Sequence, residues 1–216
     1  MEQGILTSMR VRRSARWVAA ILSLLVALPL SSCQREPSGG FARVIAVRDG
    51  DTIELDDGRV VRYIGINTPE WGKPGADSAT ALNVRLVMGQ QVRLEFGHEL
   101  TDRYGRTLAF VYAGDRMVNR ELVRAGWAPC YFFEQNLQHA PELVRDLQEA
   151  MRAKRGLWHD PTPETADHYV ASFTSFRFHR PDCPSVIQID RDDEVIFRVR
   201  DSALFAGYSP CGRCQP

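Results

Sequence analysis

The chain has 216 residues, of which 44% are hydrophobic and 25% are charged. This length and balance exclude a disordered or low-complexity chain, and they allow one domain with a sizeable core plus a smaller unit. Basic and acidic residues number 27 each, so the formal net charge is zero. Because nucleic-acid-binding proteins are usually basic, a polyanionic partner would have to be recognised by a local site rather than by bulk charge.

The first forty residues differ from the rest of the chain. Four arginines between positions 10 and 16 precede the apolar run WVAAILSLLVALPL, which ends at LSSC. A basic start, an apolar stretch too short to span a bilayer comfortably and a small-residue end are typical of an export signal, here residues 1–32. An uncleaved membrane anchor is the alternative. Both Met1 and Met9 are possible starts, because Met9 directly precedes the arginines.

The sequence LSSC also resembles the lipobox of bacterial lipoproteins. That resemblance implies that Cys33 carries a lipid and becomes the mature N-terminus, with plain secretory cleavage near Cys33 as the alternative. Residues 33–40 are polar and contain Pro and Gly, so they are predicted to be a tether. We therefore expect a protein exported to a bacterial cell envelope, anchored to a membrane in the periplasm, or secreted. Removing residues 1–32 leaves 23 basic and 26 acidic residues, a net charge of −3.

From residue 41 the pattern is rich in strands. Short apolar or alternating stretches bounded by Gly, Asp or Asn are predicted strands, and they are 42–47, 52–55, 60–66, 91–96 and 107–113. Stretches with apolar residues at helical spacing are predicted helices, and they are 74–88, a short segment from about 118, and a longer one from about 141 to 156. About five short strands with helices inserted between and after them predict a small closed Greek-key barrel of the OB type.

The barrel domain is expected to span residues 41–160. The composition then changes to a Pro- and Thr-rich stretch, so residues 161–168 are predicted to be a linker and residues 169–216 a second unit. That unit has fewer than fifty residues and few large apolar side chains. A core this small needs an additional stabilising link, called a staple below, such as a metal ion or disulfide bonds.

Polar residues gather at the corners of the predicted barrel, in the segments DGDT, NTPE and TDRYGR and at one strand arginine. Each segment alone reads as a turn or a surface ion pair. Together they supply what phosphodiester hydrolysis needs. Glu70 is a carboxylate that can orient or deprotonate water. Arg62 and Arg106 offer guanidinium forks that match phosphoryl oxygens. Asp51, the side chain at position 67 and the carbonyl of Thr68 offer oxygen ligands to a hard cation.

The motifs DGDT, RYIGINTPE, TDRYGR and VNRELVRAGWA, in this order and spacing, resemble the staphylococcal nuclease (thermonuclease) family over residues 42–160. The resemblance implies an OB-fold barrel and calcium-dependent hydrolysis of DNA and RNA by an endonuclease. It places Asp51 and Thr68 at calcium ligands and Glu70 at the catalytic base. It places Arg62 and Arg106 at the phosphate-binding pair.

Four further positions follow from the resemblance. Arg103 and Tyr104 fall where the family contacts a terminal phosphate. Tyr131 falls near a nucleotide-stacking tyrosine, and Phe133 stands where a second tyrosine is expected. A phenylalanine ring still stacks on a base, but it offers no hydroxyl contact.

Position 67 departs from the family pattern, because Asn67 stands where the family has aspartate. Asparagine still offers a carbonyl oxygen to a metal but brings no charge, and calcium affinity depends on the number of charged ligands. We therefore expect weaker metal binding or a different divalent ion. Asp49 is a candidate to compensate, because it lies two residues from Asp51.

The C-terminal unit contains the motifs HRPDC and SPCGRC. His179, Cys183, Cys211 and Cys214 make a closed tetrahedral set for structural zinc, which would explain how so small a core is stable. Disulfide bonding is the alternative, because exported proteins meet oxidants and Cys-x-x-Cys can close on itself. The stretch also resembles the zinc-binding domain of the Ada DNA-repair protein, with His179 at the position of its first cysteine. We do not transfer that domain's methyl-acceptor role.

A structural or substrate-docking role suits this unit best. Arg177, Arg180 and Arg213 are candidate contacts to a phosphate backbone, although residues 190–194 are acidic.

Two functions stay open on the sequence alone. One is an exported, lipid-anchored nuclease acting on DNA and/or RNA, with calcium or another divalent cation and structural zinc. The other is a catalytically silent module in which the barrel and the zinc unit engage nucleic acid or an envelope partner. The joint presence of Arg62, Glu70 and Arg106 favours the nuclease. Nothing in the sequence indicates an oligomer.

Overall fold

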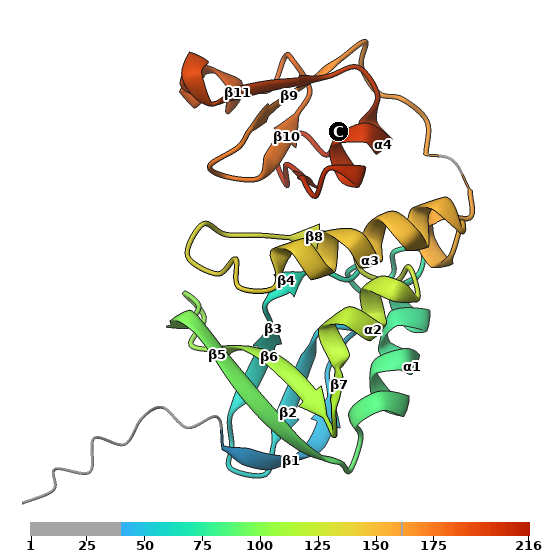
Figure 1. Cartoon of the computed structure of the whole chain (residues 1–216), viewed down its shortest axis with the longest axis vertical. Helices are drawn as coiled ribbons and strands as arrows, with labels where there is room; N and C mark the ends of the chain where they lie inside the picture. The colour runs from blue at the N-terminus through green and yellow to red at the C-terminus, as the bar shows by residue number, and fades with distance from the viewer. Residues whose placement is uncertain (1–39, 161) are drawn as a thin grey trace, which may run out of the picture. The chain divides into compact units, whose positions relative to one another are not determined.

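The structure is a computed structural model that describes residues 40–160 and 162–216 (Figure 1). The predicted export signal, all but the last residue of the predicted tether and the lipidation site Cys33 lie outside these residues. Within the described ranges, no helix has the length and apolar character needed to cross a bilayer. The described residues belong to one compact unit. The domain boundary predicted at 161–168 stays a prediction.

Five strands close into a barrel. They are β1 (Phe41–Val47), β2 (Thr52–Leu55), β3 (Val60–Tyr63), β5 (Gln91–Thr101) and β6 (Thr107–Ala113). The strands run antiparallel in the order β3-β2-β1-β5-β6, and a parallel pairing of β3 with β6 closes the ring. The short β7 (Arg116–Met117) extends β6 as a hairpin. Closure removes free sheet edges, and the predicted OB-type barrel is confirmed.

One predicted strand is interrupted. The stretch 60–66 divides into β3 and β4 (Gly65–Ile66), and β4 pairs with β8 (Cys130–Tyr131) instead of continuing in the barrel. Gly65 has a φ of +78°, and a Cβ there would lie 2.7 Å from the side chain of Leu143. Only glycine fits such a position without strain. The break turns the chain towards NTPE and brings Tyr131 beside it.

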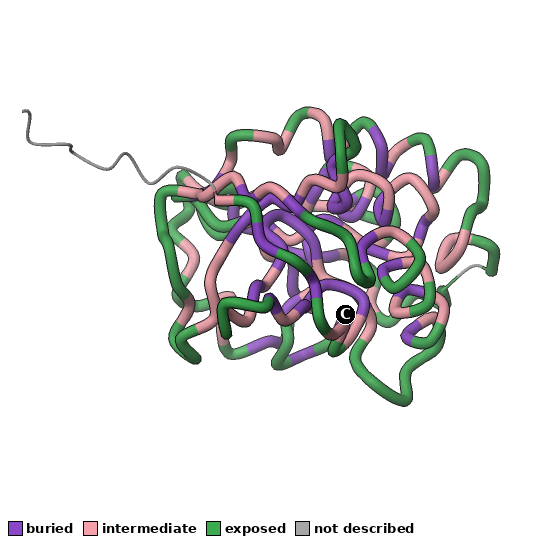
Figure 2. Tube along the Cα trace, turned by 90° about the horizontal axis from the view of Figure 1, so that it is seen from below, coloured by how far each residue is buried: buried purple, intermediate pink, exposed green. Residues whose placement is uncertain are grey.

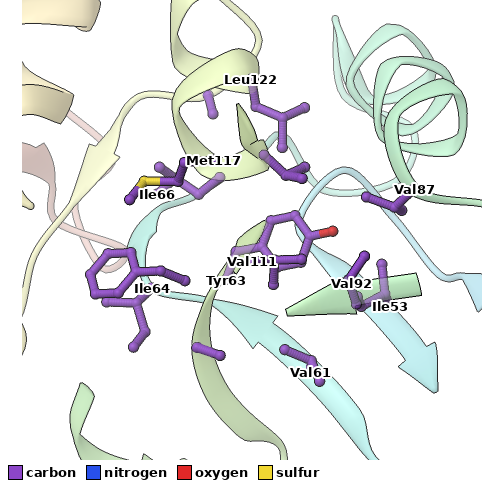
Figure 3. Packing of buried hydrophobic residues seen from close by; sticks show 14 of the residues in the cluster. Ile53, Val61, Tyr63, Ile64, Ile66, Val87, Val92, Val111, Met117 and Leu122 are labelled. Carbon is purple, nitrogen blue, oxygen red and sulfur yellow. The ribbon is translucent and has the colours of Figure 1, made fainter. Parts of the chain in front are cut away.

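The barrel core consists of the inward side chains of the strands. Tyr63, Val92 and Val111 pack together in its centre (Figure 3). Three helices add to the apolar cluster, and they are α1 (Ala76–Val87), α2 (Val118–Arg124) and α3 (Ala140–Arg152). A 3-10 turn, η1 (Gly156–Trp158), follows α3. Buried segments run through the middle of the fold, with exposed loops around them (Figure 2). The three predicted helices are confirmed. The first, α1, lies within the predicted range 74–88, and the third, α3, ends at Arg152 rather than at about residue 156.

Residues 169–216, called the C-terminal module below, build a second, smaller sheet with the strand order β11-β9-β10-β12. Its elements are β9 (Tyr169–Ser172), β10 (Arg177–His179), η2 (Val186–Gln188), η3 (Arg191–Asp193), β11 (Glu194–Phe197), α4 (Arg200–Phe205) and β12 (Ser209–Pro210). Five fully or nearly fully buried apolar residues, among them Tyr169, Phe178 and Leu204, form its core. A core of that size supports the expectation that the module needs a further staple.

A buried ion pair joins α2 to α3. Asp146, which is 5% exposed, accepts hydrogen bonds from the guanidinium groups of Arg120 and Arg124. We expect Asp146→Ala to lower the free energy of unfolding by about 2–3 kcal/mol, because it removes three charge-assisted hydrogen bonds at once. The matched control is Glu149→Ala, whose carboxylate is 63% exposed and which should cost under about 0.5 kcal/mol. Urea unfolding measures both, and equal losses would contradict the prediction.

Candidate active site

The DGDT corner before β2 packs tightly against the NTPE turn. A Cβ on Gly50 would lie 2.7 Å from the Cβ of Thr68, so the two turns approach this closely only with glycine there. Asp51 Oδ2 accepts hydrogen bonds from the backbone N–H of Thr68 at 2.6 Å and from its hydroxyl at 2.9 Å. Asp49 Oδ1 accepts the backbone N–H of Asp51 at 2.9 Å. These bonds fix the Asp51 carboxylate at the barrel rim.

The electrostatics of Asp51 favour a nearby cation. Burial raises the pKa of the Asp51 carboxyl, the guanidinium of Arg62 opposes that shift, and the Asp49 carboxyl adds to it. Arg62 Nε lies 3.2 Å from Asp51 Oδ1. A buried carboxylate stays ionised only with a positive partner. Asp51 therefore has the character of a cation ligand.

Arg62, on β3, is held from several sides. Its Nη1 donates to the carbonyls of Tyr63 at 2.8 Å and Ile66 at 3.0 Å. Its Nη2 donates to Asn67 Oδ1 at 2.7 Å. The oxygens of Asp51 and Asn67 thus face the same positive group. Carboxylate and amide oxygens are also the ligand types that a hard divalent ion prefers.

The second arginine is positioned by an aspartate that the sequence analysis did not select. Asp102 Oδ2 accepts Arg106 Nε at 2.7 Å, and Asp102 Oδ1 accepts the backbone N–H groups of Tyr104 and Arg106. Burial would raise the pKa of the Asp102 carboxyl, but these donors outweigh it and hold the pKa below its usual range. In the same turn Arg103 Nη2 donates to the Tyr104 hydroxyl at 2.7 Å. The turn after β5 therefore presents Arg103, Tyr104 and Arg106 as one hydrogen-bonded group.

One cleft of about 820 Å³ collects these groups. Its walls include eight of the nine barrel residues predicted for the site, and these are Asp51, Arg62, Asn67, Glu70, Arg103, Tyr104, Arg106 and Tyr131. The ninth, Thr68, is buried behind Asp51. Glu70 is exposed on the cleft wall, where its carboxylate can meet water. Four separate segments of sequence thus converge on one polar surface.

Asn83 is a second residue that sequence reasoning missed. Its fully buried side chain accepts the Tyr63 hydroxyl at 2.9 Å and donates to the carbonyl of Asp49 at 3.0 Å. The bonds tie α1 to the DGDT corner. An asparagine on the apolar face of a predicted helix, beside Ala79 and Leu82, was the available signal, because buried polar groups need partners.

The C-terminal module holds a separate cluster. The ligand atoms of His179, Cys183, Cys211 and Cys214 all lie within 4.8 Å of one another, and all four side chains are buried. The three cysteines are free thiols. His179 Nδ1 is buried and has no hydrogen-bond partner in the structure. An orphaned imidazole nitrogen beside three thiols fits a tetrahedral metal ion.

Comparisons with known proteins identify relatives of the barrel domain. Residues 60–160 match the family described as staphylococcal nuclease homologue. The thermonuclease of Staphylococcus hyicus is 37% identical over 125 residues, which cover 54% of this chain and 74% of that protein. The thermonuclease of Staphylococcus intermedius is 34% identical over 139 residues, covering 60% and 83%. A protein of Escherichia coli O157:H7 named uncharacterized endonuclease is 40% identical over 125 residues, covering 56% and 78%.

The fold and the site place the chain among OB-type barrels with a polar cleft at the barrel rim. Within that class, the chain belongs to the staphylococcal nuclease family.

Proposed function

We propose that this chain is a divalent-metal-dependent nuclease that hydrolyses phosphodiester bonds in DNA and/or RNA. The observation that carries the proposal is the convergence of Arg62, Glu70 and Arg106 on one cleft. Membership of a family whose relatives are named thermonuclease and endonuclease supports it. A binding module without activity would need none of these three groups in one place.

The proposed roles follow from the chemistry of each group. Glu70, exposed on the cleft wall, orients or deprotonates the attacking water. Arg62 and Arg106 bind the phosphoryl oxygens as negative charge gathers on them in the transition state. Asp102 acts through Arg106 by fixing its Nε. Arg103 and Tyr104 are proposed to contact a terminal phosphate, and Tyr131 is proposed to stack on a nucleotide base.

We propose that Asp51, Asn67 and the carbonyl of Thr68 hold a calcium or other divalent ion. The two side-chain oxygens support this, because they already converge on the guanidinium of Arg62. The ion would neutralise phosphate charge and orient the phosphoryl group. With Asn67 in place of aspartate, the site has one carboxylate fewer.

The missing charge at position 67 gives a testable expectation. Asn67→Asp should tighten calcium binding by about tenfold or more, because calcium affinity rises with the number of charged ligands. Asp49→Asn should weaken it if Asp49 compensates for the missing charge. Calorimetric titration with calcium measures both affinities. Unchanged binding in Asp49→Asn would remove Asp49 from the metal site, and unchanged binding in Asn67→Asp would remove position 67.

For the rest of the chain we propose export through residues 1–32, a lipid at Cys33 that anchors the protein to a bacterial membrane, and structural zinc in an Ada-like C-terminal module. The sequence pattern of the first 33 residues supports the export proposal. The four clustered ligand residues support zinc.

The deciding experiment is an assay of the purified chain. Single- and double-stranded DNA and RNA are incubated with calcium, magnesium or a chelator, and product lengths are read on a gel. We expect cleavage that a chelator abolishes and that Glu70→Gln lowers by about 10²–10⁴-fold. The matched control Glu149→Gln alters an exposed carboxylate on α3 and should cleave normally. Binding without cleavage would instead favour the silent module.

A further inference from the structure

A second hollow continues the cleft. It has a volume of about 420 Å³ and is lined by Tyr131, Phe133, Glu134, Gln135, Thr174, Ser175 and Arg177. Tyr131 and Phe133 also line the main cleft. The hollow thus begins where the cleft reaches its aromatic pair, and its far wall comes from the C-terminal module.

Arg177 is the main cation of this hollow. Its guanidinium carbon lies 3.7 Å from the ring centroid of Tyr131 and 5.0 Å from that of Phe133. Its Nη1 donates to the carbonyl of Phe132 and to the hydroxyl of Ser209, among other oxygens. Guanidinium groups stacked on aromatic rings are held flat and rigid. Arg177 thus braces one face of Tyr131 from the module.

Arg177 has no carboxylate partner among the described residues. Its hydrogen bonds run from Nη1 to neutral oxygens, and no acidic side chain of residues 40–160 or 162–216 forms an ion pair with it. Such a group suits an anion that fits a planar fork, and phosphate does so.

We propose that the hollow is a second nucleotide subsite in which Arg177 binds a backbone phosphate of single-stranded nucleic acid beside the aromatic pair. The inference rests on the proposed function and extends it, because it gives the C-terminal module a part in holding the substrate. Single strands suit the arrangement, since they present bases for stacking on Tyr131 and Phe133 next to phosphates. Glu134 also lines the hollow and disfavours a second phosphate there, so we expect the subsite to hold one.

The test measures binding without turnover. In full chain carrying Glu70→Gln, the affinity for labelled single-stranded DNA of two and of twelve nucleotides is measured at several salt concentrations. We expect Arg177→Met to weaken twelve-nucleotide binding by about fivefold or more and to reduce the salt slope by about 0.7. Dinucleotide affinity should change less than about twofold, because the main cleft is intact.

A second variant avoids any effect on folding. Gln135 is exposed in the hollow, so Gln135→Glu should weaken twelve-nucleotide binding by charge repulsion. Gln91→Glu makes the same change at the exposed start of β5 and should have no effect. Two outcomes would overturn the subsite but leave the proposed nuclease function intact. One is an equal loss of affinity for the two-nucleotide and twelve-nucleotide strands. The other is unchanged twelve-nucleotide affinity in both Arg177→Met and Gln135→Glu. Absence of binding at both lengths overturns the nuclease and the subsite together.

Discussion

Replacing Arg62 with lysine is expected to lower the rate of phosphodiester cleavage by about 10²–10³-fold. Lysine keeps the positive charge that Asp51 needs, so the barrel rim should keep its fold. It loses the planar fork, which now makes four contacts to Asp51, Asn67 and two backbone carbonyls. A single ammonium group cannot satisfy those acceptors and a phosphate oxygen at once. Steady-state kinetics on a single-stranded oligonucleotide measure the loss.

The matched control for this prediction is Arg48→Lys. Arg48 is also an arginine next to the DGDT corner, but its side chain is half exposed and pairs with Glu54. Exposed ion pairs of this kind contribute little to stability, so the cleavage rate of Arg48→Lys should stay within about twofold of the wild-type rate. Thermal unfolding of Arg62→Lys shows whether a lower cleavage rate comes from the missing guanidinium or from a loss of folded protein. Near-normal cleavage by a folded Arg62→Lys protein would show that Arg62 does not contact the reacting phosphate.

The barrel was predictable because local and global signals agree. Alternating strands, the Asp-Gly turn and Gly89 after the first helix mark element boundaries without knowledge of the fold. The order of strands and helices then limits the architecture to few choices. The exceptions come from tertiary contacts. The strand break at Gly65 follows from the close approach of Leu143, and no local pattern reports a neighbour 78 positions away.

The strand β5 shows the same limit. The alternation predicts its end at Phe96, but the strand runs to Thr101 with a shift of register on the way. A Cβ on Gly97 would lie 2.1 Å from Asn136 Oδ1, and that same oxygen accepts the backbone N–H of His98. A distant asparagine thus carries the strand past the point where its pattern ends.

The site divides along similar lines. Groups that contact a substrate belong to motifs, so Arg62, Glu70 and Arg106 could be selected from the sequence. The groups that hold these side chains in place do not belong to such motifs. Asp102 was visible only as part of a turn, and Asn83 only as an odd polar residue in a helix. Arg177 reaches Tyr131 from another module, a contact that depends on packing alone.

The second large effect concerns the C-terminal module. Cys211→Ser is expected to remove bound zinc and to unfold the module, because a structural zinc ion contributes on the order of 10 kcal/mol of folding free energy in small domains. The module's own core is too small to replace that contribution. Metal analysis of the purified chain should find about one zinc in the wild type and none in Cys211→Ser. Hydrogen exchange should show β9 and β10 losing protection.

The effect of Cys211→Ser should extend to the hollow that Arg177 lines. The backbone N–H of Cys211 donates to the carbonyl of Phe178 at 2.9 Å, and Ser209 Oγ accepts Arg177 Nη1 at 2.8 Å. If Cys211 binds zinc as proposed, its replacement should loosen β10 and β12, the two strands that hold Arg177 against Tyr131. Cys211→Ser should weaken twelve-nucleotide binding about as much as Arg177→Met does. Cys130→Ala, a change in the barrel core, should keep zinc and keep that affinity.

Thiol counting decides between zinc and the disulfide alternative. If zinc holds the cluster, chelation and denaturation without reductant should expose the thiols of Cys183, Cys211 and Cys214. If a disulfide holds it, two of the three stay unreactive until a reductant is added, and the wild type binds no zinc. In the zinc case the stability of the module also falls when a chelator is present, since an ion that binds only the folded state stabilises it by mass action. A wild-type chain that melts at the same temperature with and without chelator would therefore exclude zinc as the staple.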